Sequence, residues 1–238
     1  MRLRLVTYNI HKCRGMDRLV RPERILAVLR AIGADIIALQ EVLSLPGGSP
    51  EIDQAGYFAS QLGYQLAMGE NRRLRDAAYG NAVLSRFPLH SCSNYDLSVA
   101  GRERRGSFRT EVLYSPGRRL QVFNVHLGTG FFERRQQAQA LLQQLTENCG
   151  TASPRVVLGD FNEWTKGLTS RLLAAHLRTA DIRVHLNRRR TYPGLFPVLH
   201  LDHVYYDPVI ELESLELYRK APALMASDHL PQIAEFRV

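Results

Sequence analysis

Residues 3–41, LRLVTYNIHKCRGMDRLVRPERILAVLRAIGADIIALQE, carry the clearest indication of the architecture. Leu3 to Tyr8 is a short apolar run that predicts a strand. Pro22 to Ile32 places apolar residues at helical spacing, and Pro22 suits the first position of a helix. Gly33 is typical of a helix end, and Asp35 to Leu39 predicts a buried strand. The segment therefore predicts a compact strand–helix–strand unit.

Strand-like and helix-like segments alternate through the rest of the chain, and Pro116-Gly117 indicates a hairpin. Strands outnumber helices, and several neighbouring strands look antiparallel. This favours an α/β fold of mixed sheets covered by helices. With no long linker and no internal repeat, we expect one domain over residues 1–238. The further strands are predicted over 64–68, 81–85, 107–114, 120–125, 155–158, 201–206, 210–217 and 233–238, and the further helices over 51–62, 133–146 and 168–175.

The composition limits the class of protein and suggests an anionic partner. The 238 residues carry a formal net charge of +8, and the 31 basic residues comprise 28 arginines and three lysines. Such an excess is typical of proteins that bind nucleic acid, phospholipid or a phosphorylated substrate, although a general bias toward arginine is an equal explanation. The 45% hydrophobic content excludes a disordered or fibrous protein.

The sequence also indicates the cellular compartment of the protein. No apolar run reaches the roughly 18–20 residues that span a bilayer, and the N-terminus has no signal-peptide pattern. Three scattered cysteines fit neither a disulfide framework nor a zinc site. We therefore expect a cytoplasmic protein with reduced cysteines.

Polar side chains end several of the apolar runs, where catalytic groups tend to lie. Each has an ordinary structural explanation when taken alone, such as a turn residue or a solvated side chain. As a set they supply carboxylates, carboxamides and histidines at the ends of strands. The residues are Asn9, Glu41, His126, Asp160, Asn162, Asp202, Asp228 and His229.

This set of groups is suited to phosphoester chemistry. Carboxylate and amide oxygens without soft ligands favour a hard cation such as Mg²⁺, with Mn²⁺ as the alternative. A histidine with a carboxylate partner can transfer a proton or stabilise an oxyanion. Together they predict metal-assisted hydrolysis of a phosphoester.

Seven short motifs occur in one order along nearly the whole chain. They are Thr7-Tyr8-Asn9-Ile10, Leu39-Gln40-Glu41-Val42, Gly80-Asn81-Ala82-Val83-Leu84-Ser85, Val125-His126-Leu127, Gly159-Asp160-Phe161-Asn162 and Leu201-Asp202-His203-Val204-Tyr205, and Ser227-Asp228-His229 closes the series. With these motifs the chain resembles the endonuclease/exonuclease/phosphatase superfamily, which is DNase I-like, and within it the small bacterial members.

The resemblance implies a four-layer α/β sandwich of two mixed, mostly antiparallel sheets with helices outside and the site at one end. It implies that Glu41 is the principal metal ligand, with Asn9 and Asp228, and that Asp160 orients or deprotonates the attacking water. Asn162 would hold phosphate and nucleophile, and Asp202 would support the charge of His229. His126 and His229 are assigned as a pair, without deciding which is acid or base. Asn81, Asn162 and Arg105 are expected to contact substrate.

Three residues depart from the pattern of the family. Cys13 stands where bacterial relatives often have glycine, and we expect a buried spectator thiol. His203 stands where an aromatic residue is common and is expected to be a neutral replacement. His11 lies close to Asn9 and is a minor candidate for the cleft.

Three functions remain open from the sequence. A DNA or RNA phosphodiesterase is favoured by the clusters Arg72-Arg73-Leu74-Arg75, Arg102 to Arg105, Arg134-Arg135 and Arg188 to Arg190. A phospholipid phosphodiesterase is the alternative, because Phe131-Phe132 and Leu195 to Leu199 could touch a membrane. A non-catalytic binding module is disfavoured, since no motif is lost. We expect a monomer, and clusters that surround the site would favour a long polyanion.

Overall fold

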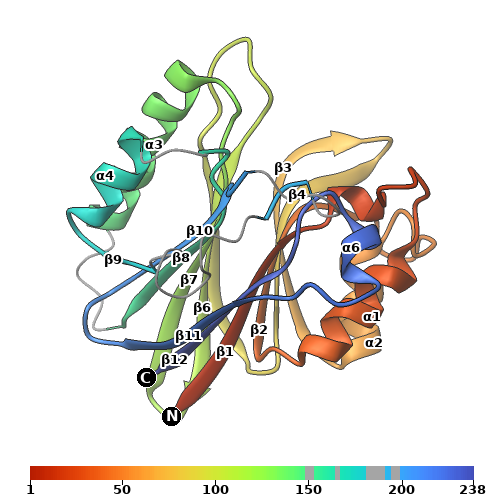
Figure 1. Cartoon of the computed structure of the whole chain (residues 1–238), viewed down its shortest axis with the longest axis horizontal. Coiled ribbons are helices and arrows are strands. Elements are labelled where there is room, and N and C mark those ends of the chain that lie inside the picture. The colour runs from red at the N-terminus through yellow and green to blue at the C-terminus, as the bar shows by residue number, and fades with distance from the viewer. Residues whose placement is uncertain (148–152, 164–166, 181–190, 194–198) are drawn as a thin grey trace.

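The computed structural model describes residues 1–147, 153–163, 167–180, 191–193 and 199–238. Two six-stranded sheets pack face to face, and helices cover their outer faces (Figure 1). The expected four-layer sandwich is therefore confirmed.

The first sheet is built from the N-terminal half and the C-terminal end of the chain. Its order is β11-β12-β1-β2-β4-β3. The strands are β1 (Arg2–Asn9), β2 (Ile36–Ser44), β3 (Gln65–Leu74), β4 (Ala77–Ser85), β11 (Glu211–Leu217) and β12 (Gln232–Arg237). Helices α1 (Pro22–Ile32), α2 (Gln54–Leu62) and α6 (Ala223–Ala226) contribute to the apolar cluster on its outer face.

The second sheet uses the middle of the chain in the order β5-β6-β7-β8-β10-β9. Its strands are β5 (Leu89–Asp96), β6 (Gly106–Ser115), β7 (Arg118–His126), β8 (Arg155–Asp160), β9 (Arg178–Thr179) and β10 (Asp202–Tyr206). Helices α3 (Phe131–Glu147) and α4 (Leu168–Ala174) cover it. None of the helices in the described ranges combines the length and hydropathy needed to cross a membrane.

Each sheet has one parallel pair at its centre, and this pairing positions the site. β1 runs parallel to β2 with Asn9 opposite Gln40, and β7 runs parallel to β8 with His126 opposite Asp160. The other pairings are antiparallel. Because the strands of a parallel pair end at the same edge, each pair delivers two strand-end residues to one place.

Alternation along the strands divides the core into layers. Leu3 and Leu5 of β1 face the second sheet and join a cluster shared by both sheets. Val6 and Tyr8 of the same strand face the helices instead. A third cluster lies between the second sheet and α3 and α4. Burial on both faces explains the apolar runs of the central strands, such as Ile36 to Leu39 in β2 and Val156 to Leu158 in β8.

Candidate active site

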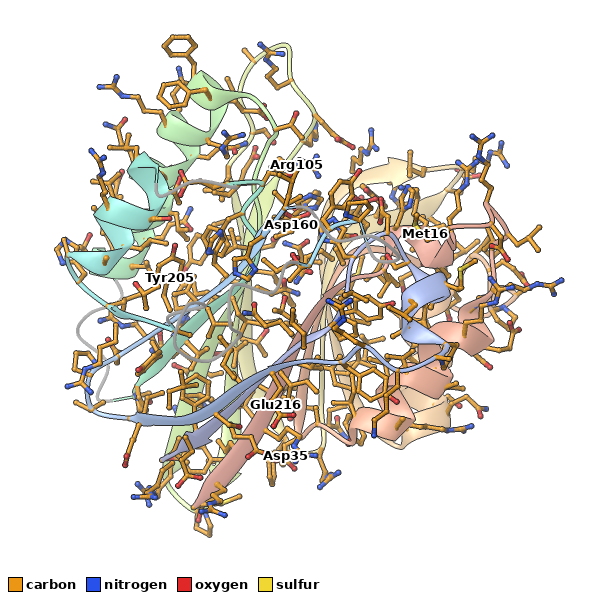
Figure 2. All side chains as sticks on the ribbon, viewed as in Figure 1. Met16, Asp35, Arg105, Asp160, Tyr205 and Glu216 are labelled. Carbon is orange, nitrogen blue, oxygen red and sulfur yellow. The ribbon has the colours of Figure 1, made fainter. Side chains whose placement is uncertain are left out.

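The strand ends predicted to carry chemistry meet at one end of the sandwich. Asn9 ends β1, Glu41 lies in β2, His126 ends β7 and Asp160 ends β8. Figure 2 shows Asp160 and Arg105 at the upper end of the molecule, between the two sheets. Residues far apart in the sequence are thus brought within contact distance by the two parallel pairs.

One oxygen of Asp160 is the centre of the cluster. Its Oδ2 accepts a hydrogen bond from Asn9 Nδ2 at 3.0 Å. His229 Nε2 lies 3.5 Å and His126 Nε2 3.6 Å from the same oxygen. The other oxygen, Oδ1, accepts from the backbone of Asn162 at 2.9 Å. A buried carboxylate between two imidazoles is an arrangement suited to moving protons.

His229 is held in its charged form by a buried carboxylate. Its Nδ1 donates to Asp202 Oδ2 at 3.0 Å, and both side chains are buried. Burial alone would lower the pKa of His229, but Asp202 and Asp160 raise the pKa to about 10. Asp202 thus lies where it supports the charge of His229.

His126 has the opposite environment. Arg105 Nη1 lies 3.0 Å from both ring nitrogens. Burial and the Arg105 charge lower the pKa of His126 to about 4, although Asp160 and Glu41 act against them. The two histidines therefore differ in charge at neutral pH.

Glu41 makes more hydrogen bonds than the sequence suggested. Lys12 Nζ lies 2.7 Å from its Oε2, and Asn9 Nδ2 donates to its Oε1 at 3.2 Å. The hydroxyl of Tyr79 in β4 is a further donor to this carboxylate. Burial raises the pKa of Glu41, but the charges of His126 and Lys12 outweigh it and keep the pKa well below its ordinary value. Glu41 is therefore an anion available to a cation.

The oxygen-rich end of the site fits an Mg²⁺ ion that is bound by only a few protein ligands. No three His, Cys, Asp or Glu side chains converge in a metal-binding group within the described residues. Mg²⁺ does not need such a group, because one or two carboxylates, water and substrate phosphate satisfy it. Glu41 and Asp160 both contact the same Asn9 amide, so two carboxylates face one small region.

Asn9 and Asp228 are placed differently from a preformed pair of metal ligands. Asn9 Oδ1 accepts from the His11 backbone at 3.0 Å, so its amide nitrogen faces the carboxylates. Asp228 Oδ1 lies 3.5 Å from His11 Nδ1 and accepts from Ser227 Oγ at 3.3 Å. Their role as ligands stays a prediction, and Glu41 is the member of the set with the clearest geometry.

Several site residues have left-handed backbone. Glu41 has φ 58° and Asn162 has φ 50°. His11, Lys12 and Cys13 follow one another at φ 45°, 55° and 59°. Such conformations are costly for residues with a side chain and gather at functional sites. The Asn162 amide also donates to Leu127 O at 2.9 Å, which fixes it beside Asp160.

Asn81 lies beneath the site rather than at its surface. Its side chain is fully buried, and Nδ2 donates to the backbone oxygens of Gly106 and Asn124, both at 3.1 Å. The Asn124 amide in turn bonds Leu39 O and Ala82 O across the sheets. Asn81 therefore joins the two sheets under the site. Both of its amide hydrogens are used in these contacts, and its expected contact with substrate stays a prediction.

The three residues that depart from the family pattern have separate places. Cys13 is buried among apolar side chains, and burial raises the pKa of its thiol. His203 Nε2 bonds Glu163 O at 2.8 Å, and its ring contacts Phe161. His11 faces Asp228 as described above, so it is the only one of the three that touches a predicted site residue.

Two arginine clusters meet beside the site. Glu103 bridges them, with Arg72 Nη2 at 2.6 Å and Arg105 Nη2 at 2.8 Å. The guanidinium of Arg72 lies 4.8 Å from the centre of the Tyr79 ring. Arg134, by contrast, bonds Gly128 O and Thr129 O within its own turn. The cluster 188–190 and residues 195–198 of the predicted membrane contact lie outside the described residues.

Lys12 and Tyr79 contact Glu41 and were not assigned site roles from the sequence. Lys12 belongs to the Asn-Ile-His-Lys run that follows the first strand, and Tyr79 directly precedes the Gly80-Asn81 motif. The one sequence feature that could have identified them as site residues is that each lies next to a motif. Their contact with Glu41 depends on the turn after β1 and on cross-sheet packing, which a local pattern does not contain.

Comparison with known proteins matches most of the chain to one family. A family model described as the Endonuclease/Exonuclease/phosphatase family matches residues 6–229. The uncharacterized protein YbhP of Escherichia coli is 34% identical over 216 residues, which cover 85% of this chain and 83% of YbhP.

Solved structures of similar fold have lower sequence identity. An endonuclease/exonuclease/phosphatase from Beutenbergia cavernae matches with a TM-score of 0.77 at 24% identity, over 100% of this chain and 72% of its own. The mannosyl-6-phosphatase Bt3783 of Bacteroides thetaiotaomicron matches with a TM-score of 0.75 at 17% identity, over 99% and 100%.

Proposed function

The chain belongs to the endonuclease/exonuclease/phosphatase family, a family of phosphoric ester hydrolases, and we propose that it is a divalent-metal-dependent phosphodiesterase that acts on DNA. The observation that carries the proposal is the position of Asp160, whose Oδ2 lies within 3.6 Å of Asn9, His126 and His229. The family generally depends on divalent metals. Glu41, with Asn9 and Asp228, would hold Mg²⁺ or Mn²⁺, which would neutralise phosphate charge.

In the proposed reaction, Asp160 orients a water and takes its proton as the water oxygen attacks phosphorus. The ester P–O bond opposite breaks, and the leaving oxygen takes a proton. Asn162 is fixed beside Asp160 by two hydrogen bonds and would hold the phosphate. Because a phosphodiester becomes more negative at the transition state, fixed positive charge at this point favours the reaction.

We infer that the two histidines divide this work. His229, with a pKa raised to about 10 by Asp202 and Asp160 against burial, carries a proton at neutral pH and can stabilise or protonate oxygen. His126, with a pKa lowered to about 4 by burial and Arg105, is neutral and offers a hydrogen bond without charge. Arg105 supplies a cation beside His126.

The placement of arginines supports DNA as the substrate. Arg72 and Arg105 come from two clusters and meet at Glu103, next to Tyr79 and His126. Arg75, Arg102 and Arg104 on the same two loops are exposed. Cations beside the reacting groups, with further exposed arginines in the neighbouring turns, are suited to a long phosphate backbone.

One observation favours a phospholipid as the second candidate substrate. Phe131 and Phe132, which begin α3, are 61% and 75% exposed. Exposed aromatic pairs are typical of interaction surfaces, including membrane contacts. We also propose a single domain, because one apolar cluster joins both sheets, and the monomeric state stays a prediction. The cytoplasmic address remains an expectation from cysteine usage.

The proposal is tested by offering the protein several substrates with Mg²⁺ or Mn²⁺. Plasmid DNA, abasic duplex, RNA, cardiolipin, sphingomyelin and a chromogenic phosphodiester form the panel. We expect cleavage of DNA that EDTA abolishes. We expect Asp160→Asn and His229→Ala to lose at least about a hundredfold in rate, while the exposed control Glu211→Gln keeps it.

The outcomes separate the candidates. Cleavage of lipid without cleavage of nucleic acid would overturn DNA in favour of phospholipid. Full activity of Asp160→Asn would overturn the site. If no substrate is turned over, with or without EDTA, the protein would instead be a non-catalytic binding module.

A further inference from the structure

Lys12 occupies a fixed position against the predicted metal ligand. Its Nζ lies 2.7 Å from Glu41 Oε2 and 5.4 Å from the centre of the Tyr79 ring. The side chain is 33% exposed, so the ammonium faces both the carboxylate and solvent. It is one of only three lysines in a chain with 28 arginines.

The backbone that carries Lys12 is held in place. Lys12 has φ 55°, in the middle of three consecutive left-handed residues. The fully buried Gln54 donates its amide to Lys12 O at 2.8 Å and accepts from the Leu43 backbone at 3.2 Å. A costly conformation supported by a buried hydrogen bond indicates a position set by the fold.

The two oxygens of Glu41 are thereby divided. Oε2 is paired with the Lys12 ammonium, whereas Oε1 accepts a longer hydrogen bond of 3.2 Å from the uncharged Asn9 amide. The Tyr79 hydroxyl, the further donor to this carboxylate, is also uncharged. Of the two oxygens, Oε2 is therefore the one held by a cation, and a metal ion arriving at Glu41 meets Oε1.

We propose that Lys12 is a specificity-determining residue that restricts Glu41 to one metal-facing oxygen and thereby favours Mg²⁺ over Ca²⁺. This rests on the proposed metal site. Mg²⁺ binds single carboxylate oxygens in octahedral geometry, whereas Ca²⁺ takes 6–8 ligands and readily uses both oxygens of one carboxylate. Loss of the ammonium frees Oε2, and only the larger ion gains a second bond from it.

Loss of the Lys12 charge and release of Glu41 Oε2 have different effects on metal affinity. Removing the positive charge of Lys12 strengthens the binding of every divalent cation alike. Freeing Oε2 strengthens Ca²⁺ alone. The ratio of the two affinities therefore reports the proposed role, and a loss of folding or of general affinity does not imitate it.

The experiment is calorimetric titration of the full chain with Mg²⁺ and with Ca²⁺, without substrate. The variants are K12M, with K12A as a second truncation, and K12R, which keeps charge and donors. We expect K12M and K12A to bind both ions more tightly and to lower the preference for Mg²⁺ by roughly fivefold, the scale of a partly exposed ion pair. K12R should keep the preference, as should K220M, a lysine variant outside the site.

Two further results distinguish the proposals. Equal tightening of Mg²⁺ and Ca²⁺ in K12M would overturn the role of Lys12 in selectivity while leaving the metal site intact. If E41Q binds both ions as the unmodified protein does, the metal site of the proposed function is wrong, and the inference about Lys12 is wrong with it.

Discussion

His126 and His229 both lie near the carboxylate of Asp160, but at neutral pH one ring is neutral and the other is charged. His229 has Asp202 behind it, and His126 has Arg105. Both rings are buried, so solvent does little to weaken these interactions. Burial disfavours the charged form of both rings and, with Arg105, keeps His126 neutral, whereas Asp202 and Asp160 together outweigh burial at His229.

Asp202→Asn tests the environment of His229 through stability. A raised pKa in the folded state gives stabilisation that is complete below pH 6.5, the ordinary value, and lost as pH rises through about 10. Each pKa unit is worth about 1.4 kcal/mol. We expect the variant to be less stable than the unmodified protein by a few kcal/mol below pH 6.5, with the difference narrowing toward pH 10.

Urea unfolding at both ends of this pH window measures the effect. Asp76→Asn, on an exposed turn, is the control and should show no such trend. A deficit in Asp202→Asn that does not change with pH would contradict the charge-supporting role of Asp202.

At this scale the sequence located the strand-end residues but not their orientations. Asp160, His126 and His229 were predicted to meet, and they do. Asn81 was predicted to contact substrate, which stays a prediction, and its amide joins the two sheets, which the sequence did not indicate. Rotamers and cross-sheet hydrogen bonds decide such details, and they depend on partners more than a hundred residues away or in the other sheet.

Among the elements, the parallel strands β7 and β8 pack so closely that no side chain fits at Gly159. Gly159 lies opposite Val125 with φ 146°, in a region that only glycine adopts readily. A Cβ added there would lie 1.9 Å from Val125 O. This close approach holds Asp160 next to His126.

Gly159→Ala should therefore destabilise the protein by roughly 2–4 kcal/mol, because backbone strain and overlap add. Thermal unfolding measures it. Gly63→Ala is the matched control, since Gly63 has φ 69° but nothing within 4 Å of an added Cβ. Equal losses in the two variants would show that overlap with Val125 contributes nothing.

Local signals explain which elements the sequence could predict. The helix over Pro22–Ile32 was predicted with its observed bounds, because Pro22 and the left-handed Gly33 mark both ends. β5 was not predicted, since His90, Ser91 and Ser93 make it polar, and its pairing with β6 supplies what its sequence lacks. β9 has only two residues and α6 four, too few for a periodic pattern.

For the molecule as a whole, the distribution of arginines gives a prediction about salt. If the exposed Arg75, Arg102 and Arg104 contact phosphates, the logarithm of the DNA binding constant falls linearly with the logarithm of salt concentration. The triple alanine variant should reduce that slope by about 2–3. Fluorescence anisotropy at several salt concentrations measures it.

A second triple variant controls for net charge. Arg2, Arg118 and Arg237 lie at the other end of β1, β7 and β12, so their replacement by alanine removes the same charge away from the site. If both triple variants change the salt slope of DNA binding equally, the arginines near the site have no special role, and the arginine excess is explained by a general compositional bias.

The chain ends also meet away from the reacting groups. The Met1 amino group donates to Val238 O at 2.7 Å, and Figure 1 shows both ends at the bottom of the sandwich. A short peptide could therefore join them into a circular chain, and new ends could be opened at an exposed turn such as Gly117. In that permuted protein the order of the seven motifs along the chain would change, while the place where their side chains meet would not.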